Sequence, residues 1–481
     1  MAERHGIYVE EVPFQPLTEA TTDVTIPFVV GTAPVNLTQL SGYPVNVPIL
    51  ARTYEEAVSA LGYSDDWANF TLSEVIYAHF QLYRQSPIVL VNVLDPARHK
   101  TAVTATSLLL VKGVGTINAD GVLTSTLVVT SSDGSKTYVL GTDYRLTTNA
   151  AGRVVISRIS TGTIGASDTV RVAYDKLDGS AVTSADIIGG TDAATGKVSG
   201  LELLKQVYPR FQVVPSLVLA PGFSDDPVVA AVLNAKAEKI SGNFKAIALT
   251  DLPADEKYLD LSGWKEDNNY DFQSEINSWP LVTYQGKTYR YSTHLAALIC
   301  RTDADSSGVP YRSPSSKELL VDGTVMADGT EVALTIDEAN VLNGDGIVTA
   351  LNFGGWKAWG NRTAIYPEKT DPQSSFIPVR RMFNWVNNAL ILRFANDVDE
   401  PTDRRLIDSV IDEANVWLNG LTSSGYILGG RVEFLASDNP DVNLVNGKML
   451  FRLYLTPPSP AQEISYLVAY DPQYLAVLTA A

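Results

Sequence analysis

The side chains best suited to chemistry in this sequence are its four histidines and its one cysteine. The histidines stand at positions 5, 79, 99 and 294, and the cysteine at position 300. Nucleophilic hydrolysis needs a histidine held between a carboxylate and a nucleophile. His294 is the best placed for this role, on an expected helix, but no Gly-x-Ser-x-Gly turn accompanies it. We therefore expect His294 to be structural, Cys300 to be a small core residue, and the chain to have no catalytic residues.

Two further motifs partly match a nucleotide-binding motif and a metal-binding motif, and neither match is complete. Residues 190–198 carry one residue too many between their outer glycines for a phosphate-binding P-loop, and Val198 cannot hold Mg²⁺ as a serine or threonine would. An ordinary turn ahead of a helix is the better interpretation. Asp303 and Asp305 lack the rest of a calcium loop, and no His/Cys spacing fits a zinc site. The sequence thus predicts neither a cofactor nor a metal.

Composition excludes several classes of partner. The chain has 481 residues, 45% of them apolar, so it can bury large cores in roughly three domains. Its net charge of −18 disfavours direct binding to nucleic acid or anionic membranes and permits charge-complementary protein partners. A single cysteine excludes an internal disulfide and fits assembly in a reducing cytosol. Because we find no basic-then-apolar leader and no apolar run near the about 18 to 20 residues of a membrane helix, we expect a soluble, unexported chain.

Residues 102–180 differ in composition from the rest of the chain. They contain no Pro, Trp, Phe, Glu, Gln or His, are rich in Thr, Ser, Gly and Val, and hold seven basic residues against six aspartates. Short β-forming runs recur there between Gly and Asp turns, at residues 127–130, 136–140, 154–157 and 169–174. This pattern predicts a small all-β domain inserted into a larger one.

The sequence before this insert is typical of an α/β fold. Residues 88–94 form a near-continuous apolar run, as in a strand that is covered on both faces. Thr71 with Glu74, and Thr53 with Glu56, have the spacing of capping boxes that open helices. We expect two helices and a buried strand here.

A strand-helix-strand unit follows the insert. Residues 213–220 and 244–249 are typical of strands, and between them Asp226 and Pro227 form a helix start, with a helix end expected at Gly242. Such a unit predicts parallel strands covered by helices.

From about Thr363 onward the pattern changes to α+β. A first amphipathic helix has its apolar face at Val379, Phe383, Val386, Leu390 and Phe394. A second helix, residues 402–421, has an apolar stripe, with Arg404, Arg405, Asp408 and Asp412 outside it. Two strands, 431–435 and 448–455, complete this region.

Both ends of the chain carry strand-forming sequence with no folding partner beside it. Residues 6–13 and 463–470 mix apolar and polar positions as a half-buried strand does. The apolar residues expected to pair are Ile7, Tyr8, Val9 and Val12 at one end and Ile464, Tyr466, Val468 and Tyr470 at the other. Residues 474–478 form a further strand-like run. A free strand must find an edge, either in the chain's own sheets or by strand addition to a neighbouring copy, and the sequence leaves both open.

Several short segments follow one another in order along nearly the whole chain. They are residues 6–13, 26–34, 185–190 with 195–197, and 343–363, then the pairs Arg380-Arg381 and Phe383-Asn384, and residues 457–464. Each segment is modest by itself. Together, in this order, they resemble contractile phage tail sheath proteins.

The resemblance implies an α/β and α+β multidomain architecture. Sheath proteins of this family have a subtilisin-like α/β core, in topology only, with an inserted β-sandwich domain, an α+β C-terminal domain that faces the tail tube, and extended strand-like terminal arms. The expected divisions are an N-terminal arm (1–20), the first part of the α/β core (21–101), the inserted all-β domain (102–180), the second part of the core (181–362), the C-terminal domain (363–460) and a C-terminal arm (461–481).

The resemblance also implies a structural function. Such proteins stack as hexameric rings in a helical array around a tube, are linked by exchanged arms, and contract to drive the tube through a cell envelope. The implied partners are further copies, the tail tube protein, and baseplate and tail terminator proteins, with no direct contact to nucleic acid or membrane. The implied location is the tail of a phage, prophage or phage-derived particle, assembled in the host bacterial cytoplasm.

Because the family's C-terminal domain lies against the tube, the exposed face of the second helix is a candidate tube contact. Arg404, Arg405, Asp408 and Asp412 are its charged residues, and a merely solvated face is the simpler alternative. Two other functions remain open. A hydrolase on the same α/β core would need a convergent site, and a monomeric carbohydrate- or surface-binding module using the insert would leave the arms unexplained.

Overall fold

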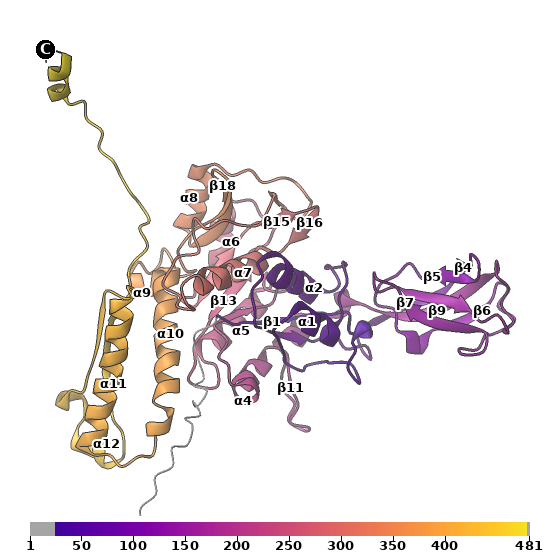
Figure 1. Ribbon diagram of the computed structural model, residues 1–481, viewed down its shortest axis with the longest axis horizontal. Helices are drawn as coiled ribbons and strands as arrows, with labels where there is room; N and C mark the ends of the chain where they lie inside the picture. Colours follow the sequence, from indigo (N-terminus) through magenta and orange to yellow (C-terminus); the bar gives the residue numbers. More distant parts are fainter. Residues whose placement is uncertain (1–24, 479–481) are drawn as a thin grey trace, which may run out of the picture.

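The computed structural model describes residues 25–478, and its centre is an eight-stranded mixed sheet (Figure 1). The strand order is β19-β18-β14-β13-β12-β1-β3-β2. The strands are β1 (Pro27–Gly31), β2 (Ile49–Ala51), β3 (Ile88–Asn92), β12 (Leu217–Leu219), β13 (Ile247–Asp251), β14 (Glu275–Ser278), β18 (Ile347–Asn352) and β19 (Trp356–Trp359). The strands from β18 to β3 pair in parallel, whereas β19 and β2 are antiparallel at the two edges.

The sequence patterns explain why the sheet is parallel and buried. The apolar run at residues 88–94 contains β3, every residue of which is buried. The predicted strand-helix-strand unit is confirmed, because β12 pairs in parallel with β13 and α5 (Pro227–Glu238) connects them. Asp226 caps α5 and Pro227 occupies its first turn, as predicted. β12 begins at Leu217 and α5 ends at Glu238, so both are shorter than predicted.

The helix before β3 begins differently from the prediction. α2 (Thr71–Ile76) follows Phe70, which makes no side-chain cap, and the expected Thr71–Glu74 capping box is absent from it. Thr71 Oγ1 instead accepts a hydrogen bond from the Thr32 N–H at 3.2 Å. Glu74 Oε1 accepts one from the Arg290 N–H at 2.8 Å. Both side chains therefore serve partners that are distant in the sequence.

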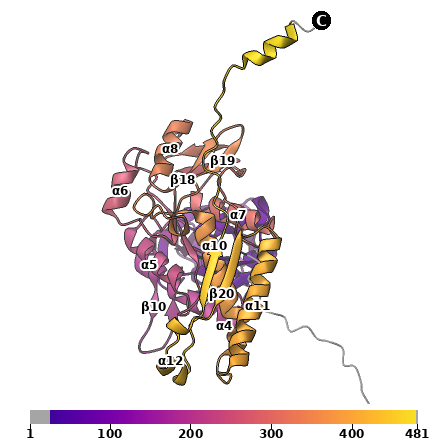
Figure 2. The ribbon, with the colours of Figure 1, turned by 90° about the vertical axis from the view of Figure 1, so that its left-hand side faces the viewer.

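Helices and short strands surround the sheet. A large apolar core fills most of the space between them, and a smaller cluster that includes Leu261 and Leu342 packs α6 and α8. The helices are α1 (Tyr54–Leu61), α3 (Ser184–Ile188), α4 (Val207–Phe211), α6 (Leu261–Asp267), α7 (Tyr291–Ala304), α8 (Ile336–Gly344) and α9 (Pro372–Ser375). The short strands are β10 (Gly190–Thr191), β11 (Val198–Ser199), β15 (Leu281–Tyr284), β16 (Lys287–Tyr289) and β17 (Gly323–Val325). In both views α6 and α8 lie at the upper end of the core, and α4 and the β10–β11 hairpin lie at the lower end (Figures 1 and 2).

Between β3 and α3 the chain forms two three-stranded antiparallel sheets, with the orders β4-β9-β6 and β5-β8-β7. Their strands are β4 (Lys100–Leu109), β5 (Val114–Thr116), β6 (Val128–Ser131), β7 (Tyr144–Thr148), β8 (Val154–Arg158) and β9 (Thr169–Leu177). A separate apolar cluster that includes Val129, Ile156 and Val172 holds them together. Lys100 pairs with Leu177, so the chain enters and leaves this unit side by side. Figure 1 shows the unit projecting from the core on the side opposite α11.

The C-terminal region packs two long helices against a two-stranded sheet. Its elements are α10 (Ile377–Arg393), α11 (Arg404–Ser423), β20 (Gly429–Glu433), α12 (Asp441–Val445) and β21 (Arg452–Thr456). Met382 of α10 and Ala414 and Leu418 of α11 are buried in its own apolar cluster. α11 begins where Asp403 accepts a hydrogen bond from the Leu406 N–H at 2.7 Å. The amphipathic pattern of the sequence therefore predicted this helix correctly.

Beyond β21 the chain extends away from the body (Figures 1 and 2). Residues 457–471 form no helix or strand, and Pro472–Leu478 forms a 3₁₀-helix. The prediction of a strand at residues 474–478 is therefore wrong for the isolated chain, because no neighbouring strand offers hydrogen bonds and a short helix supplies them locally. The predicted N-terminal arm lies outside the described residues. Within residues 25–478, no helix is both long enough and apolar enough to span a bilayer.

Candidate assembly interface

His294 and Cys300 lie in the buried core on α7. His294 Nδ1 is 3.1 Å from the Tyr83 hydroxyl, and its ring meets the rings of Tyr83 and Tyr289 edge-on. Burial, with a smaller effect of the nearby His79, lowers the pKa of His294 to about 3, so its ring is neutral at pH 7. Burial also raises the pKa of the Cys300 thiol. Both residues therefore serve packing, as the sequence predicts.

At the carboxyl ends of the parallel strands, where α/β proteins bind ligands, the polar side chains satisfy one another. Asp251 accepts hydrogen bonds from the Ser292 N–H at 2.8 Å, the Ser292 hydroxyl at 2.5 Å and the Ser278 hydroxyl at 3.1 Å. The cavity beside them, also lined by Asp225 and Arg290, measures about 10 Å³, room for roughly one water molecule. The described part of the chain contains no cluster of three or more His, Cys, Asp or Glu side chains able to hold a metal ion. The cavity beside Asp251 therefore offers no room for a substrate.

The segment that approaches a P-loop folds as the β10–β11 hairpin. Its turn is closed by Asp192, whose Oδ1 accepts hydrogen bonds from the N–H groups of Ala194 and Thr195 at 3.0 and 2.7 Å. A 3₁₀-helix, Gly200–Gln206, follows directly. The predicted turn ahead of a helix is confirmed.

The described part of the predicted C-terminal arm, residues 461–478, leaves its apolar side chains in solvent. Ile464, Tyr466, Val468 and Tyr470 are 70, 85, 94 and 79% exposed. They occupy alternate positions, so they share one face whenever this segment is extended. The base of the arm is held where Arg362 Nη2 donates to Gln462 Oε1 at 2.8 Å. The corresponding N-terminal residues Ile7, Tyr8, Val9 and Val12 lie outside the described residues.

The β20–β21 sheet has one closed edge and one open edge. The Asn415 amide on α11 donates to the Val432 carbonyl at 3.2 Å and accepts from the Val432 N–H at 2.9 Å, which closes the outer edge of β20. Leu453 lies directly opposite Val432 in the antiparallel pair. The N–H and C=O of Leu453 therefore point away from β20, to the outer edge of β21. No other strand of the described chain pairs with that edge, so it is available for strand addition.

An apolar groove of about 500 Å³ includes Leu453 and so lies beside this open edge. Its apolar lining includes Leu390, Phe394, Leu406, Val410 and Phe451. A strand added to β21 could direct one row of side chains into this groove, which requires apolar residues at alternate positions. Sequence reasoning missed both Asn415 and the open edge, because nothing in an isolated strand pattern shows which edge is closed.

The four charged residues predicted to contact a tube lie along the exposed face of α11. Arg404, Arg405 and Asp412 are exposed, and Asp408 is partly exposed. Arg404 Nη2 is 2.8 Å from Asp408 Oδ1, one helical turn away. Figure 2 shows α11 and β20 on the face of the molecule opposite the β4–β9 unit. Their position leaves all four accessible to a partner.

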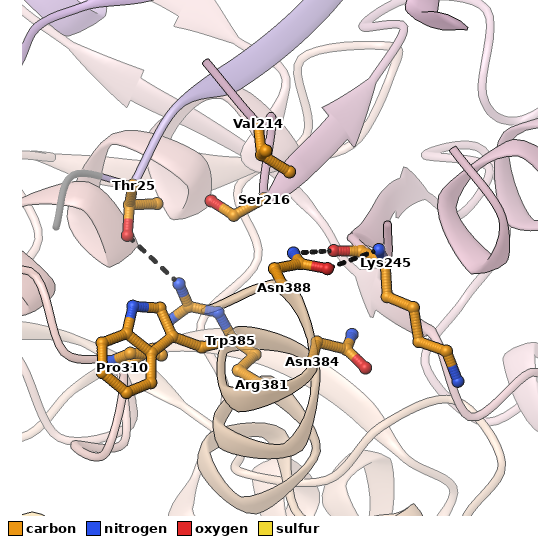
Figure 3. Close-up of a pocket in the computed structure, with 9 residues that line it drawn as sticks. All are labelled: Thr25, Val214, Ser216, Lys245, Pro310, Arg381, Asn384, Trp385 and Asn388. Atoms are coloured by element: carbon orange, nitrogen blue, oxygen red, sulfur yellow. Dashed lines mark hydrogen bonds between the residues drawn. The ribbon is translucent and has the colours of Figure 1, made fainter. Parts of the chain in front are cut away.

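A buried ion pair joins α10 to the core. Arg381 Nη1 and Nη2 donate to the two carboxylate oxygens of Asp303 at 3.0 and 2.5 Å. The Thr25 hydroxyl donates to the same carboxylate and also lies 3.5 Å from Arg381 Nη2 (Figure 3). Beside this cluster, Asn388 pairs with the N–H and C=O of Lys245 at 2.8 and 2.7 Å. The start of the described chain is thus tied to both α7 and α10.

The architecture matches chains from contractile injection machines. A chain in the anti-feeding prophage baseplate is 15% identical and superposes with a TM-score of 0.59, covering 98% of this chain and 100% of that one. A sheath complex of an extracellular contractile injection system in the contracted state matches with a TM-score of 0.58 at 15% identity, over 98% of this chain and 99% of that one. These likenesses define the class of fold.

Sequence relatives identify the family within this class. The tail sheath protein of Burkholderia phage BcepMu is 30% identical over 469 residues, which is 93% of each chain. The tail sheath protein of Escherichia phage P2 is 24% identical over 332 residues, 67% of this chain and 78% of that protein. No family model matches the sequence. The chain belongs to the tail sheath protein family.

Proposed function

We propose that this sheath protein polymerises helically around a tail tube and contracts to drive the tube through a target cell envelope. Its polymer consists of stacked hexameric rings, it contacts the tube, baseplate and tail terminator proteins, and it forms part of a virion or phage-like particle assembled in the host bacterial cytoplasm. One observation carries the proposal. An exposed, alternately apolar arm and an open strand edge beside an apolar groove occur in one chain.

The arm and the edge match in periodicity. Ile464, Tyr466, Val468 and Tyr470 would all face the groove if residues 463–470 paired with β21. Main-chain hydrogen bonds return only about 1 kcal/mol each, whereas ordering each residue costs about 1 to 2 kcal/mol. Burial of these side chains must therefore stabilise the added strand, with the many copies of a polymer supplying avidity.

The direction of the arm favours a neighbour as the acceptor. Figure 1 shows the arm leaving upward from the end of the C-terminal region near α9, whereas α12 and the loop between α10 and α11 lie at the lower end. Residues 397–400 and 402 of that loop line the groove. A donor at one end and an acceptor at the other form a heterologous contact, which propagates as an open helix or closes as a ring. The N-terminal arm, with Ile7, Tyr8, Val9 and Val12, would link further copies in the same way.

We further propose that the sheath core has subtilisin-like topology, that the two small sheets form a β-sandwich domain, and that the domains divide at residues 20, 101, 180, 362 and 460. The parallel sheet with its helices supports the first point. The separate apolar cluster of the insert supports the second. We place the tube contact on α11, which lies on the side of the core opposite the insert. The small cavity beside Asp251, with its mutually hydrogen-bonded side chains, gives no support to a hydrolase.

Electron microscopy tests the polymer directly. Negatively stained purified protein should form hollow cylinders or rings, and removal of residues 1–15 or of residues 461–481 should leave a folded, soluble protein without long polymers. Small featureless particles from the intact chain under all assembly conditions would argue against a sheath polymer. Normal-length tubes from both truncations would show that the arms do not link the copies.

A further inference from the structure

The two ends of the α/β core carry opposite charge. At the end formed by α6 and α8, residues 253–271 and 326–345 contain eleven acidic and two basic side chains. At the end formed by α4 and the β10–β11 hairpin, residues 190–212 and 236–245 contain six basic and three acidic side chains. We call these the acidic end and the basic end. In a chain with a net charge of −18, the basic end is a local exception.

The acidic end contains a groove of about 480 Å³. Its apolar walls are Tyr258, Met326, Val332 and Leu334, and its acidic residues are Asp255, Asp328, Glu331 and Glu338, with Lys257 as the basic member. Trp279 also lines the groove and is 2% exposed.

The basic end has charges that no acidic side chain neutralises. Glu202 forms ion pairs with Lys205 and Lys236. Lys197 and Arg210, by contrast, are exposed and form no ion pair within the described part of the chain. Tyr208 contacts Phe244 through their rings, which places residues 236–245 beside α4. Long basic side chains present both an aliphatic stem and a charged tip, the two properties that an apolar groove with an acidic rim accommodates.

We propose that the acidic groove receives the basic end of a second copy, so that copies stack head to tail along the direction from α8 to α4. This proposal rests on the proposed polymer and names a body-to-body contact within it. The reverse stacking would bring two acidic or two basic ends together, and like charges repel, so the charges also set the polarity of the stack.

The C-terminal arm supports the same direction. In Figures 1 and 2 the arm and the acidic end both point upward, whereas the basic end and the loop between α10 and α11 lie at the lower end. Residues of that loop line the groove beside β21. A copy placed above thus presents its basic end to the acidic groove and its open β21 edge to the arm. Each contact joins the upper end of one copy to the lower end of the next. Both contacts can therefore repeat together in an open polymer.

A charge-swap experiment tests the stacking. The basic-end variant carries Lys197→Glu and Arg210→Glu, the acidic-end variant carries Asp328→Lys and Glu331→Lys, and a third variant carries all four changes. A control variant carries Lys112→Glu and Arg145→Glu, which reverse two exposed cations of the insert. Light scattering and negative-stain microscopy measure the critical concentration for polymerisation at several NaCl concentrations, and circular dichroism confirms folding.

Each two-residue reversal should raise the critical concentration at least tenfold at low salt, and the four-residue variant should return to within about threefold of the parent. The control should match the parent. Reversals that polymerise like the parent would overturn the proposal, as would two defective reversals whose combination is not rescued. Failure of the parent itself to polymerise would instead count against the proposed function. If the arm truncations do not polymerise and the charge-swap variants behave as expected, both contacts are supported.

Discussion

Arg381 and Asp303 form a bidentate ion pair that is almost completely buried, with side chains 4 and 1% exposed. They come from α10 and α7, so the pair fastens the C-terminal region to the core. Breaking such a pair costs more than the pair itself contributes, because the remaining charge stays buried without a counterion.

We therefore predict that Arg381→Met destabilises the protein by about 3 to 5 kcal/mol. The combined change with Asp303→Leu should recover much of that loss, since it leaves no unpaired charge. Urea unfolding measures both variants, with the exposed Arg404→Met as the matched control, expected to change the free energy of unfolding by less than about 1 kcal/mol. A single variant as stable as the parent would show that the ion pair does not anchor α10.

The C-terminal arm should tolerate charge on one face only. Tyr466→Asp places a carboxylate on the face that would enter the groove beside β21, so we expect polymerisation to be lost. Ser465→Asp places the same charge on the opposite face and should polymerise nearly normally. Both residues belong to an exposed segment, so thermal unfolding of the monomer should not change. Equal polymerisation by the two variants in a sedimentation assay would contradict strand addition in this register.

The α11 face predicted to contact the tube can be tested by reversing its cations. Arg404→Glu with Arg405→Glu should lower monomer stability by less than about 1 kcal/mol, because exposed ion pairs such as Arg404–Asp408 contribute little. Co-assembly with tube protein should weaken, most strongly at low salt, where repulsion is least screened. Co-sedimentation with tubes at several ionic strengths measures this effect. Binding equal to the parent under every condition would remove this face from the tube contact.

The insert should be dispensable for the core. Ala102 pairs with Asp175, so a short Gly/Ser linker can replace residues 103–174 without moving the ends. This cut keeps Leu177, which belongs to the main core, but removes Leu123, which also packs there. We expect a loss of about 2 to 5 kcal/mol, with cooperative unfolding and polymerisation retained. A variant that is insoluble or unfolds without a cooperative transition would show that the insert is integral to the core.

Glu74 should make the protein less stable as pH rises. Its carboxyl group is buried, and burial raises its pKa from 4.5 to about 8 in the folded chain. Between those values the unfolded chain releases the proton while the folded chain keeps it, so the unfolded state binds fewer protons and the free energy of unfolding falls. Replacing Glu74 by Gln, whose carbonyl can still accept from the Arg290 N–H, removes this effect.

Glu74→Gln should therefore match the parent near pH 5 and exceed its stability by on the order of 2 to 4 kcal/mol at pH 8 to 9. Urea unfolding across this pH range measures the difference. Glu55→Gln, an exposed change on α1, is the control and should leave the pH profile unaltered. A parent and a Glu74→Gln variant with parallel profiles would show that Glu74 does not carry the pH dependence.

Local chemistry was readable directly from the sequence. Thr53 accepts from the Glu56 N–H at 3.1 Å and opens α1, Asp226 opens α5, and the apolar stripe of α11 is buried as its spacing predicts. These features depend on groups a few residues apart, whose geometry is set by the helix itself. The family resemblance likewise came from short segments in order, and the relatives confirm it.

Tertiary structure decided the features that depend on groups far apart in the chain. Glu74 accepts a hydrogen bond from Arg290 rather than capping its own helix, Asp303 of α7 pairs with Arg381 of α10, and Asn415 closes the edge of β20 and leaves that of β21 open. A strand-like pattern shows that a segment needs a sheet edge but does not show which edge is free. Because no edge lies beside residues 474–478 in the isolated chain, they form a helical turn instead. The physical reason is that a charge or main-chain group is satisfied by whichever partner the fold brings within hydrogen-bond distance.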